Sequence, residues 1–578
     1  MDQSSSEQRS CGSMSAMTSS THDETAAEAV PVDQAEEPLP TAEGPLPNTV
    51  VVPADEDPVA AAGSELIGGP PGRRALLGVS WWIPARFLAL ATVLTYALGL
   101  VQKLPCYTSG WFFGATTQYT HACYSDIPHL YSARGLAQGL HPYLDMLPQP
   151  TPDMKFLEYP VLTGLFMQIA GWLTPTGGVI QDRERWFWMV NAGMLLICAV
   201  VTVIALTRTH RRRPWDALLF ALAPALALNS TINWDLLAVA LTAVAMAYWA
   251  NSRTLLAGVF IGLATAAKLY PLLLLGPLLV LCWRAGRWRA FWQATGGAVG
   301  AWLLVNVPIM AASWDGWATF YTFSQTRKED FGSFWMILMQ DRNQALDSLN
   351  TWIAVLLVAS CLAVGWLTLS APRRPRYAQL VFLVVAAFVL TNKVYSPQYV
   401  LWLIPLAALA RPRWRDFLIW QACEVLYYLG IWSYLAYTGD SKQHGIGQDW
   451  YHFAVMLHLV GTLYLCAVVV RDILRPDRDP VRWDGSDDPS GGVLDFAPDV
   501  FVLGSARRLR EEAGYAAFAP AAQESSASSA DGVDWLTPED QPPADSIAPE
   551  AAAPGAPVDS LESGAAAEAA ESMAEGSA

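Results

Sequence analysis

Long apolar stretches occupy most of the region between residues 86 and 470, and no other feature of this chain constrains its fold so strongly. The sequence is 53% hydrophobic and 15% charged, and its mean hydropathy is +0.25. A helix needs roughly 20 apolar residues to cross a bilayer, so we expect an all-α polytopic membrane protein with about twelve transmembrane helices. The expected spans lie near residues 86–104, 186–207, 215–230, 234–250, 254–268, 269–284, 290–311, 351–370, 378–392, 398–410, 415–437 and 451–470.

Acidic sequence rich in Ala, Pro, Ser and Gly flanks the apolar region on both sides and accounts for the net charge of -16. Acidic side chains far outnumber basic ones near the N-terminus, and no Lys or Arg follows Glu511. Such a composition buries too little apolar surface to fold alone. We therefore predict a membrane domain at 81–475 between two disordered acidic cytoplasmic tails, 1–80 and 476–578.

The positions of Arg and Lys predict the orientation in a plasma membrane. No cleavable signal sequence precedes the first span, so we expect the N-terminus in the cytoplasm. With about twelve crossings the arginine-rich loops share one side, and both termini are then cytoplasmic. The arginines concerned are Arg73, Arg74, Arg86, Arg208, Arg211, Arg212, Arg213, Arg253, Arg284, Arg287, Arg289, Arg373, Arg374, Arg376, Arg411, Arg413, Arg415 and Arg471.

One apolar segment, 159–172, does not fit this count as a crossing, because it would put Arg208–Arg213 outside. We expect it to dip into the outer leaflet and return, which leaves 105–185 as one large outer loop with dipping or membrane-parallel helices. Cys106 and Cys123 lie in this loop. In an oxidising compartment a disulfide between them would brace the chain just before Asp126.

Four short polar motifs interrupt the apolar runs, and the charge count puts all four on the outer side. Polar and ionisable groups within or at the rim of a bilayer are costly, so they indicate a functional site. We therefore expect an outward-facing active or transport site. The motifs are YSD at Tyr124–Asp126, NWD at Asn233–Asp235, KLYP at Lys268–Pro271 and NKVYSPQY at Asn392–Tyr399.

The order of these segments resembles a known family. The segments YSDIPHLY, EYPVLTG, NWDLL, AAKLYPLLLL and NKVYSPQYVLWL are similar to those of bacterial mannosyltransferases of glycosyltransferase family 87. The resemblance covers about residues 80–475 and implies the GT-C membrane fold. It also implies an inverting hexosyltransferase that takes a sugar, mannose in the relatives, from a polyprenyl-phosphate donor. The acceptor would be a lipid or glycan on the extracytoplasmic face, with no cofactor and no nucleic-acid partner.

The resemblance also implies that a carboxylate soon after the first span is the catalytic base. Asp126 fits this position best, ahead of Asp145, Asp153 and Glu158, because it follows the first span and precedes the stretch 127–140, which we expect to form an amphipathic helix. A carboxylate there can take the proton of an attacking hydroxyl. The alternative is that Asp126 only caps that helix.

Positive groups must stabilise the departing polyprenyl phosphate, and three outward-facing cations are candidates: Lys268, Lys393 and Arg327. Either lysine could instead be an interfacial residue beside an aromatic belt. Arg327 could simply pair with Glu329 or Asp330.

Other outward-facing polar and aromatic residues are expected to bind substrate. For Asp235, helix capping is an alternative to orienting an acceptor sugar, and Gln398 stands where Pro397 can start a helix. The substrate-binding candidates are Glu158, Tyr159, Asn233, Asp235, Tyr270, Gln398 and His129.

No metal site is expected. The DxD patterns at Asp55–Asp57 and Asp477–Asp479 lie on the cytoplasmic side. Asp126 and His129 form a pair without a clear third ligand.

A polytopic transporter or lipid flippase for envelope precursors is the rival class. It would share the many helices and the polar breaks between them. Clustering of the polar groups at one rim favours the enzyme, because a carrier needs them near the bilayer midplane.

Overall fold

The computed structural model describes residues 50–66, 83–111, 116–342, 348–439, 444–483 and 485–504. Within these ranges the protein is a bundle of α-helices without a named β-strand, which confirms the all-α prediction. Five helices are long and apolar enough to cross a membrane. They are α4 (Pro84–Gln102), α9 (Ile180–Thr209), α15 (Trp288–Ala312), α18 (Leu349–Ser370) and α22 (Gln448–Leu474).

Shorter helices fill the bundle between these five, and two of them begin with a 3-10 turn that contains a proline. They are α12 (Asp235–Ala250), α13 (Thr254–Ala267), η3 (Tyr270–Leu274) with α14 (Leu275–Ala285), α19 (Tyr377–Thr391), η4 (Pro397–Tyr399) with α20 (Val400–Ala410), and α21 (Trp414–Gly439). Every residue of α20 is buried, as expected of a helix that is apolar on all sides. The number of crossings, about twelve, stays a prediction.

The span expected at 215–230 is not one helix. Pro214 and Pro224 divide it into η2 (Pro214–Ala217), α10 (Leu218–Ala221) and α11 (Pro224–Asn229). A proline has no N–H to donate and interrupts a helix. The broken backbone is tolerated because most of its side chains are buried among other helices.

Small residues let two helices approach closely. A Cβ on Gly258 of α13 would lie 2.0 Å from the carbonyl oxygen of Ala294 in α15, and one on Gly262 would lie 2.2 Å from that of Ala298. This small-residue face therefore packs inside the bundle.

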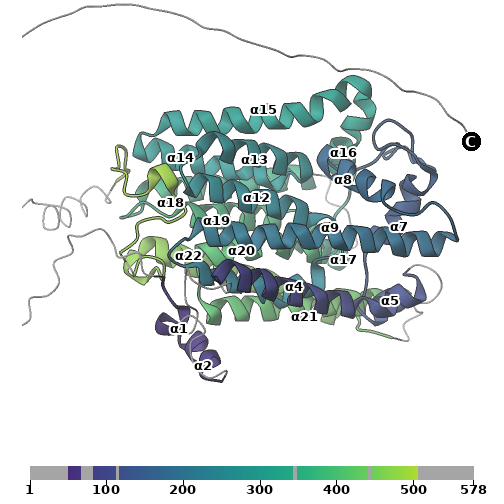
Figure 1. Cartoon of the computed structure of the whole chain (residues 1–578), viewed down its shortest axis with the longest axis horizontal. Helices are drawn as coiled ribbons and strands as arrows, with labels where there is room; N and C mark the ends of the chain where they lie inside the picture. Colours follow the sequence, from purple (N-terminus) through teal and green to yellow (C-terminus); the bar gives the residue numbers. More distant parts are fainter. Residues whose placement is uncertain are drawn as a thin grey trace, which may run out of the picture. The chain divides into compact units, whose positions relative to one another are not determined.

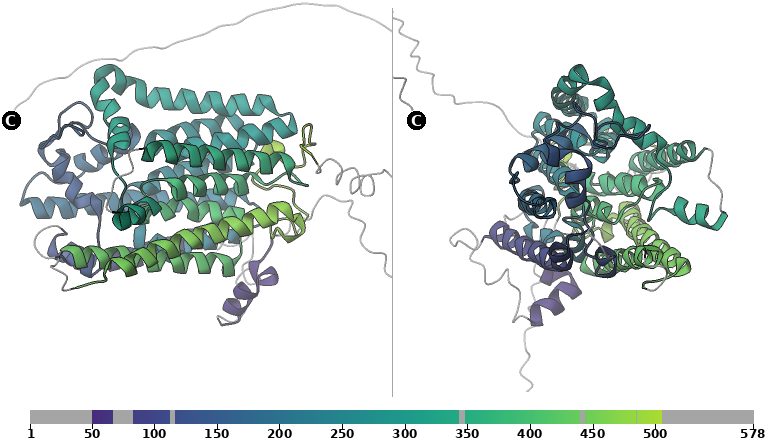
Figure 2. Two further views of the ribbon diagram at one scale, coloured as in Figure 1. Left: turned by 180° about the vertical axis from the view of Figure 1, so that it is seen from behind. Right: turned by 90° about the vertical axis from the view of Figure 1, so that its right-hand side faces the viewer.

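Short helices gather at one end of the bundle (Figures 1 and 2). They are α5 (Leu104–Ser109), α6 (Thr117–Thr120), α7 (Asp126–Ala133), η1 (Leu136–Gln138), α8 (Val161–Trp172), α16 (Trp314–Thr326) and α17 (Phe334–Arg342). At about 1.5 Å per residue, α8 is too short to cross a bilayer of about 30 Å. Its Thr163 hydroxyl donates to the Ala267 carbonyl at 2.6 Å, at the end of α13.

The arginine-rich loops meet at the other end, together with segments that we predicted to be disordered. Residues 50–66 form α1 (Pro53–Glu56) and α2 (Pro58–Leu66), and Glu56 pairs with Arg213 at 2.9 Å. Asp57 accepts a hydrogen bond from the backbone of Trp414 at 2.9 Å. The prediction of disorder throughout 1–80 was therefore wrong for this segment.

Residues 476–504 also fold onto the bundle, with η5 (Pro476–Arg478) and η6 (Gly492–Leu494). Asp479 and Arg376 form a fully buried pair at 2.7 Å, and Asp499 pairs with Arg374 and Arg284, both at 2.8 Å. The boundary at 475 was wrong because composition does not reveal that these aspartates meet arginines of distant segments. Residues 1–49 and 505–578 lie outside the described part.

Candidate active site

A cavity of about 700 Å³ opens at the end of the bundle where the short helices gather. We call it the chamber. All four polar motifs contribute to its wall, as the sequence predicts: Tyr124, Asp126, Asn233, Lys268, Tyr270, Asn392 and Gln398 line it. Segments far apart in the sequence therefore share one site.

Asp126 is the first residue of α7, but it is not the helix cap. The Ser125 hydroxyl caps the helix by accepting the Ile127 N–H at 3.3 Å, and it donates to the Thr231 carbonyl at 2.6 Å. The backbone N–H of Asp126 donates to the Ile232 carbonyl at 2.9 Å. These bonds fasten the start of α7 to the turn before α12 and leave the Asp126 carboxylate for the chamber.

Both oxygens of the Asp126 carboxylate accept a hydrogen bond. Tyr124 donates its hydroxyl to Oδ1 at 2.6 Å, and Asn233 donates from Nδ2 to Oδ2 at 2.8 Å. Burial raises the pKa of Asp126 above its usual value, Asn233, Tyr124 and Lys268 oppose this rise, and Asp235 adds to it. Each carboxylate oxygen has a second lone pair, so Asp126 can still accept a proton.

Asn233 connects Asp126 to the other polar groups. Its Nδ2 also donates to the Tyr159 hydroxyl at 2.7 Å, and its Oδ1 accepts from the backbone of Trp234 at 2.8 Å. The Lys268 ammonium lies 3.5 Å from the same Oδ1. The orientation of the Asn233 amide is thus fixed, because its Nδ2 faces acceptors and its Oδ1 faces donors.

Asp235 lies behind the chamber wall. Its side chain is fully buried in the first turn of α12, where Trp402 donates to Oδ1 at 2.8 Å and Lys268 lies at 3.4 Å. It neither caps the helix nor lines the chamber. The expectation that it binds a sugar is therefore corrected: it holds the Lys268 ammonium in place.

Two of the three predicted cations reach the chamber. Lys268 lines it with its ammonium 5.6 Å from the centre of the Tyr159 ring, and Arg327 lines it while pairing with Asp330. Lys393 is buried and does not line the chamber. Its ammonium donates to the Gln325 carbonyl at 3.1 Å and to Asn350 Oδ1 at 2.7 Å. The predicted phosphate role of Lys393 is corrected, because its ammonium ties α16 to the start of α18.

Arg134 is a chamber residue that the sequence analysis missed. It follows α7 directly and makes a bidentate ion pair with Glu158, with Nε at 2.9 and 2.8 Å from the two carboxylate oxygens. Both side chains line the chamber. Its place eight positions after Asp126, across two turns of the predicted helix, was the signal that could have revealed it.

Of the remaining substrate-binding candidates, some line the chamber and one does not. Tyr270 lines the chamber, stacks on Trp402 with ring centres 4.6 Å apart, and has its hydroxyl 3.1 Å from that of Thr242. Gln398 also lines the chamber. His129 is exposed and does not line the chamber, so its predicted role in substrate binding is corrected.

One part of the chamber wall is apolar. Phe320, Phe323, Phe388, Ile431 and Leu435 line it beside the charged groups. The chamber therefore combines a polar region around Asp126 with a surface suited to a hydrocarbon chain.

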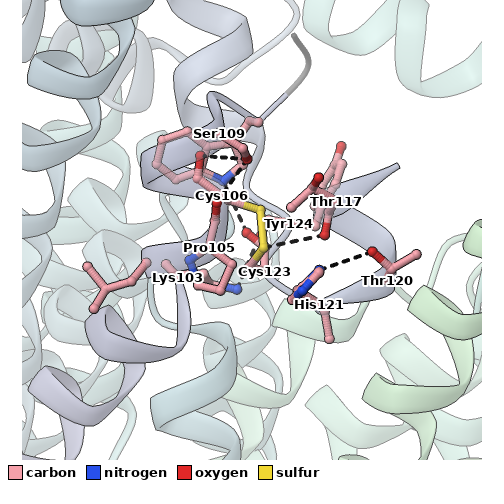
Figure 3. The surroundings of a disulfide bond; sticks show 12 residues. Lys103, Pro105, Cys106, Ser109, Thr117, Thr120, His121, Cys123 and Tyr124 are labelled. Atoms are coloured by element: carbon pink, nitrogen blue, oxygen red, sulfur yellow. Dashed lines mark hydrogen bonds between the residues drawn. A yellow bond between two sulfur atoms is a disulfide. The ribbon is translucent and has the colours of Figure 1, made fainter. Parts of the chain in front are cut away.

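The predicted disulfide between Cys106 and Cys123 is present and joins α5 to the segment before α7 (Figure 3). Trp111 donates its indole N–H to the Cys123 carbonyl at 3.0 Å. Lys103, another residue that we did not predict, is fully buried and donates to the Tyr124 carbonyl at 3.0 Å. The chain just before Asp126 is therefore held by a covalent bond and by the hydrogen bond from the buried Lys103 side chain.

In the described ranges, no group of three His, Cys, Asp or Glu side chains is arranged as metal ligands would be. In the two DxD patterns, Asp57 and Asp479 are engaged with the backbone of Trp414 and with Arg376, respectively.

The fold and the chamber define a polytopic helical membrane protein with a polar site at one end. Residues 156–391 match the model of Glycosyltransferase family 87, which confirms the resemblance over this part of the chain, less than half of it. This match, together with the fold, supports a membrane glycosyltransferase. The match begins after Asp126, so the role of this residue rests on the geometry alone.

Two solved structures are distantly similar. They are an oligosaccharyltransferase of Archaeoglobus fulgidus in the apo form, and the archaeal oligosaccharyltransferase AglB of that organism with an inhibitory peptide and a dolichol-phosphate. Each is 10% identical with a TM-score of 0.34, and the alignment covers 68% of this chain but only 56% of theirs. Such a likeness carries no argument on site or substrate. The comparison with curated proteins finds no match.

Proposed function

We propose that this protein transfers a hexose, mannose in the simplest case, from a polyprenyl-phosphate sugar to a hydroxyl of a lipid or glycan acceptor. The reaction takes place on the extracytoplasmic face of the plasma membrane, with a GT-C-type bundle holding the chamber. The carrying observation is that one chamber brings the Asp126 carboxylate together with Lys268, Arg327 and Arg134.

Asp126 is the base in this proposal. It accepts the proton of the acceptor hydroxyl while that oxygen attacks the anomeric carbon of the donor, and the bond from this carbon to the phosphate oxygen breaks. The anomeric configuration inverts in this single displacement. A raised pKa suits the role, because a base is most effective when its pKa approaches the working pH.

The cations stabilise the leaving group. Polyprenyl phosphate gains negative charge as the sugar departs, and fixed positive groups at that point lower the barrier. Lys268 is held by Asp235 at 3.4 Å. Arg327 and Arg134 each keep a carboxylate partner, so they offer their remaining N–H groups to phosphate or sugar oxygens.

The apolar wall supports a lipid-linked donor. Phe320, Phe323 and Phe388 offer a surface for the first isoprene units, while the phosphate reaches Lys268. A water-soluble nucleotide sugar would leave this surface exposed.

The test is transfer of labelled sugar by purified protein in the presence of a chelator, with polyprenyl-phosphate-mannose, -glucose and -arabinose as separate donors. Asp126→Asn should lose roughly 10² to 10⁴ of the rate, as expected for loss of a general base. The matched control is Asp153→Asn, since Asp153 is an exposed carboxylate in the same outer loop and lies outside the chamber lining.

Equal rates for wild type and Asp126→Asn would remove Asp126 as the base. A wild-type protein that transfers none of the sugars, yet moves polyprenyl-phosphate sugar across vesicle bilayers, would replace the enzyme with a flippase. Preference for one donor would identify the sugar.

A further inference from the structure

A second cavity, of about 510 Å³, lies at the end of the bundle opposite the chamber. It is formed by the last turns of α9 and α12 and by the turn that leads into α13. Three arginines, Arg208, Arg211 and Arg253, line it together with Asn251 and Tyr248. We call it the arginine cavity.

These three arginines differ from the other arginines at this end. Arg213, Arg284, Arg374, Arg376 and Arg411 are buried and each pairs with an aspartate. Arg208, Arg211 and Arg253 are exposed, and within the described ranges none of them pairs with a carboxylate. Arg211 donates to the Asn251 side chain, which is neutral. The cavity therefore carries positive charge that the described part of the protein does not neutralise.

The wall below the arginines is apolar. Val201, Ile204 and Ala205 of α9 line the cavity together with Val244 and Ala247 of α12. The ring of Tyr248 stacks on Phe260 of α13, with the ring centres 5.2 Å apart. Val201 is 37% exposed. A cationic rim above an apolar wall matches a molecule with an anionic head and a hydrocarbon tail.

We propose that the arginine cavity binds an anionic phospholipid of the membrane leaflet opposite the chamber. Its phosphate lies among Arg208, Arg211 and Arg253, and the start of an acyl chain lies along the wall of α9 and α12. Basic pockets between transmembrane helices on the cytoplasmic side recognise anionic headgroups in this way. The bound lipid clamps the ends of α9 and α12, and this role does not depend on the sugar or acceptor used in the chamber.

The binding test uses purified full-length protein in nanodiscs of phosphatidylcholine with increasing phosphatidylglycerol, followed by mass spectrometry of the lipids that remain bound. We expect phosphatidylglycerol to be retained and to raise the melting temperature. Arg208→Gln and Arg253→Gln, separately and together, should weaken its binding at least tenfold. Both side chains are exposed and neither forms an ion pair within the described ranges, so these variants should retain the wild-type helix content.

The matched control is Arg287→Gln/Arg289→Gln, which removes two exposed charges from the same end but outside the cavity. Unchanged retention in this control, with loss in Arg208→Gln/Arg253→Gln, supports the site. Equal loss of lipid retention in both double variants would show that binding depends only on net surface charge, and it would overturn the proposed site.

Two further measurements distinguish a lipid headgroup from a soluble phosphate ester as the ligand. Glycerol phosphate in solution should compete weakly, because it lacks the acyl chain that contacts Val201 and Val244. Full competition by glycerol phosphate, or equal retention of phosphatidylcholine, would overturn the lipid assignment.

Discussion

Asn233 Nδ2 lies 2.8 Å from Asp126 Oδ2, although the two residues belong to motifs separated by 107 positions in the sequence. This hydrogen bond joins the start of α7 to the turn before α12. It favours the ionised form of Asp126, while burial favours the neutral form. The balance between the two determines the pH at which the proposed base works.

Asn233→Ala should shift the acid limb of the transfer rate to higher pH. The lost hydrogen bond stabilises the carboxylate, so the pKa of Asp126 rises further and less of the base is ionised at a given pH. Hydrogen bonds to charged groups contribute about 1.5–3 kcal/mol, which corresponds to a shift of about one to two pH units. The measurement is the pH profile of kcat/KM. Asn229→Ala serves as the control, because Asn229 bonds to Ala225 within α11; an unshifted profile in Asn233→Ala would contradict the role.

Lys268→Met should lower the rate of sugar transfer by about 10² to 10³, because a preorganised charge near the leaving phosphate is lost. Lys393→Met should cost less than about tenfold, since its ammonium bonds to Gln325 and Asn350 outside the chamber. Steady-state kinetics with saturating donor would compare the two. If Lys393→Met were the more damaging change, the reading of Lys393 as a structural tie would be wrong.

Asp479→Asn should destabilise the folded protein by about 3 kcal/mol, because it leaves the buried Arg376 guanidinium without its counter-charge. The exposed neighbour Asp477→Asn, on the same short segment, should change stability little. Thermal unfolding in detergent would measure both. A chain ended at residue 475 should lose at least as much stability as Asp479→Asn; equal melting temperatures for wild type and truncated chain would show that residues 476–504 do not support the bundle.

Lys103 should make stability depend on pH. Burial lowers the pKa of its ammonium to about 7, whereas the unfolded chain keeps the usual value near 10.5. Between these two values the unfolded state binds more protons, so stability should rise as the pH increases from 7 toward 10. Lys103→Met should flatten this rise. Lys155→Met, which replaces an exposed lysine between η1 and α8, should not. The measurement is the melting temperature at pH 7.5 and at pH 9.5. An identical change between these two pH values in wild type and Lys103→Met would rule out Lys103 as the cause.

The sequence predicted the membrane class and most of the helices, because hydrophobicity and local charge are carried by neighbouring residues. It also predicted that the four polar motifs belong to one site, and all four line the chamber. It also indicated Asp126, Lys268 and the Cys106–Cys123 disulfide. It could not reveal the ion pairs of Asp479 and Asp499, since their partners lie about a hundred or more positions away. The composition of an acidic segment does not reveal whether its carboxylates pair with arginines elsewhere in the folded chain.

The tertiary structure alone decided which polar side chains face the chamber. Lys268 and Lys393 have the same local pattern, a lysine two residues before a tyrosine, yet only Lys268 lines the chamber. The sequence suggested Asp235 as a substrate ligand or a helix cap, but it lies behind the chamber wall. Arg134, which the sequence analysis did not single out, lines the chamber. The direction of each side chain depends on how helices from distant parts of the chain pack, and no local pattern encodes that packing.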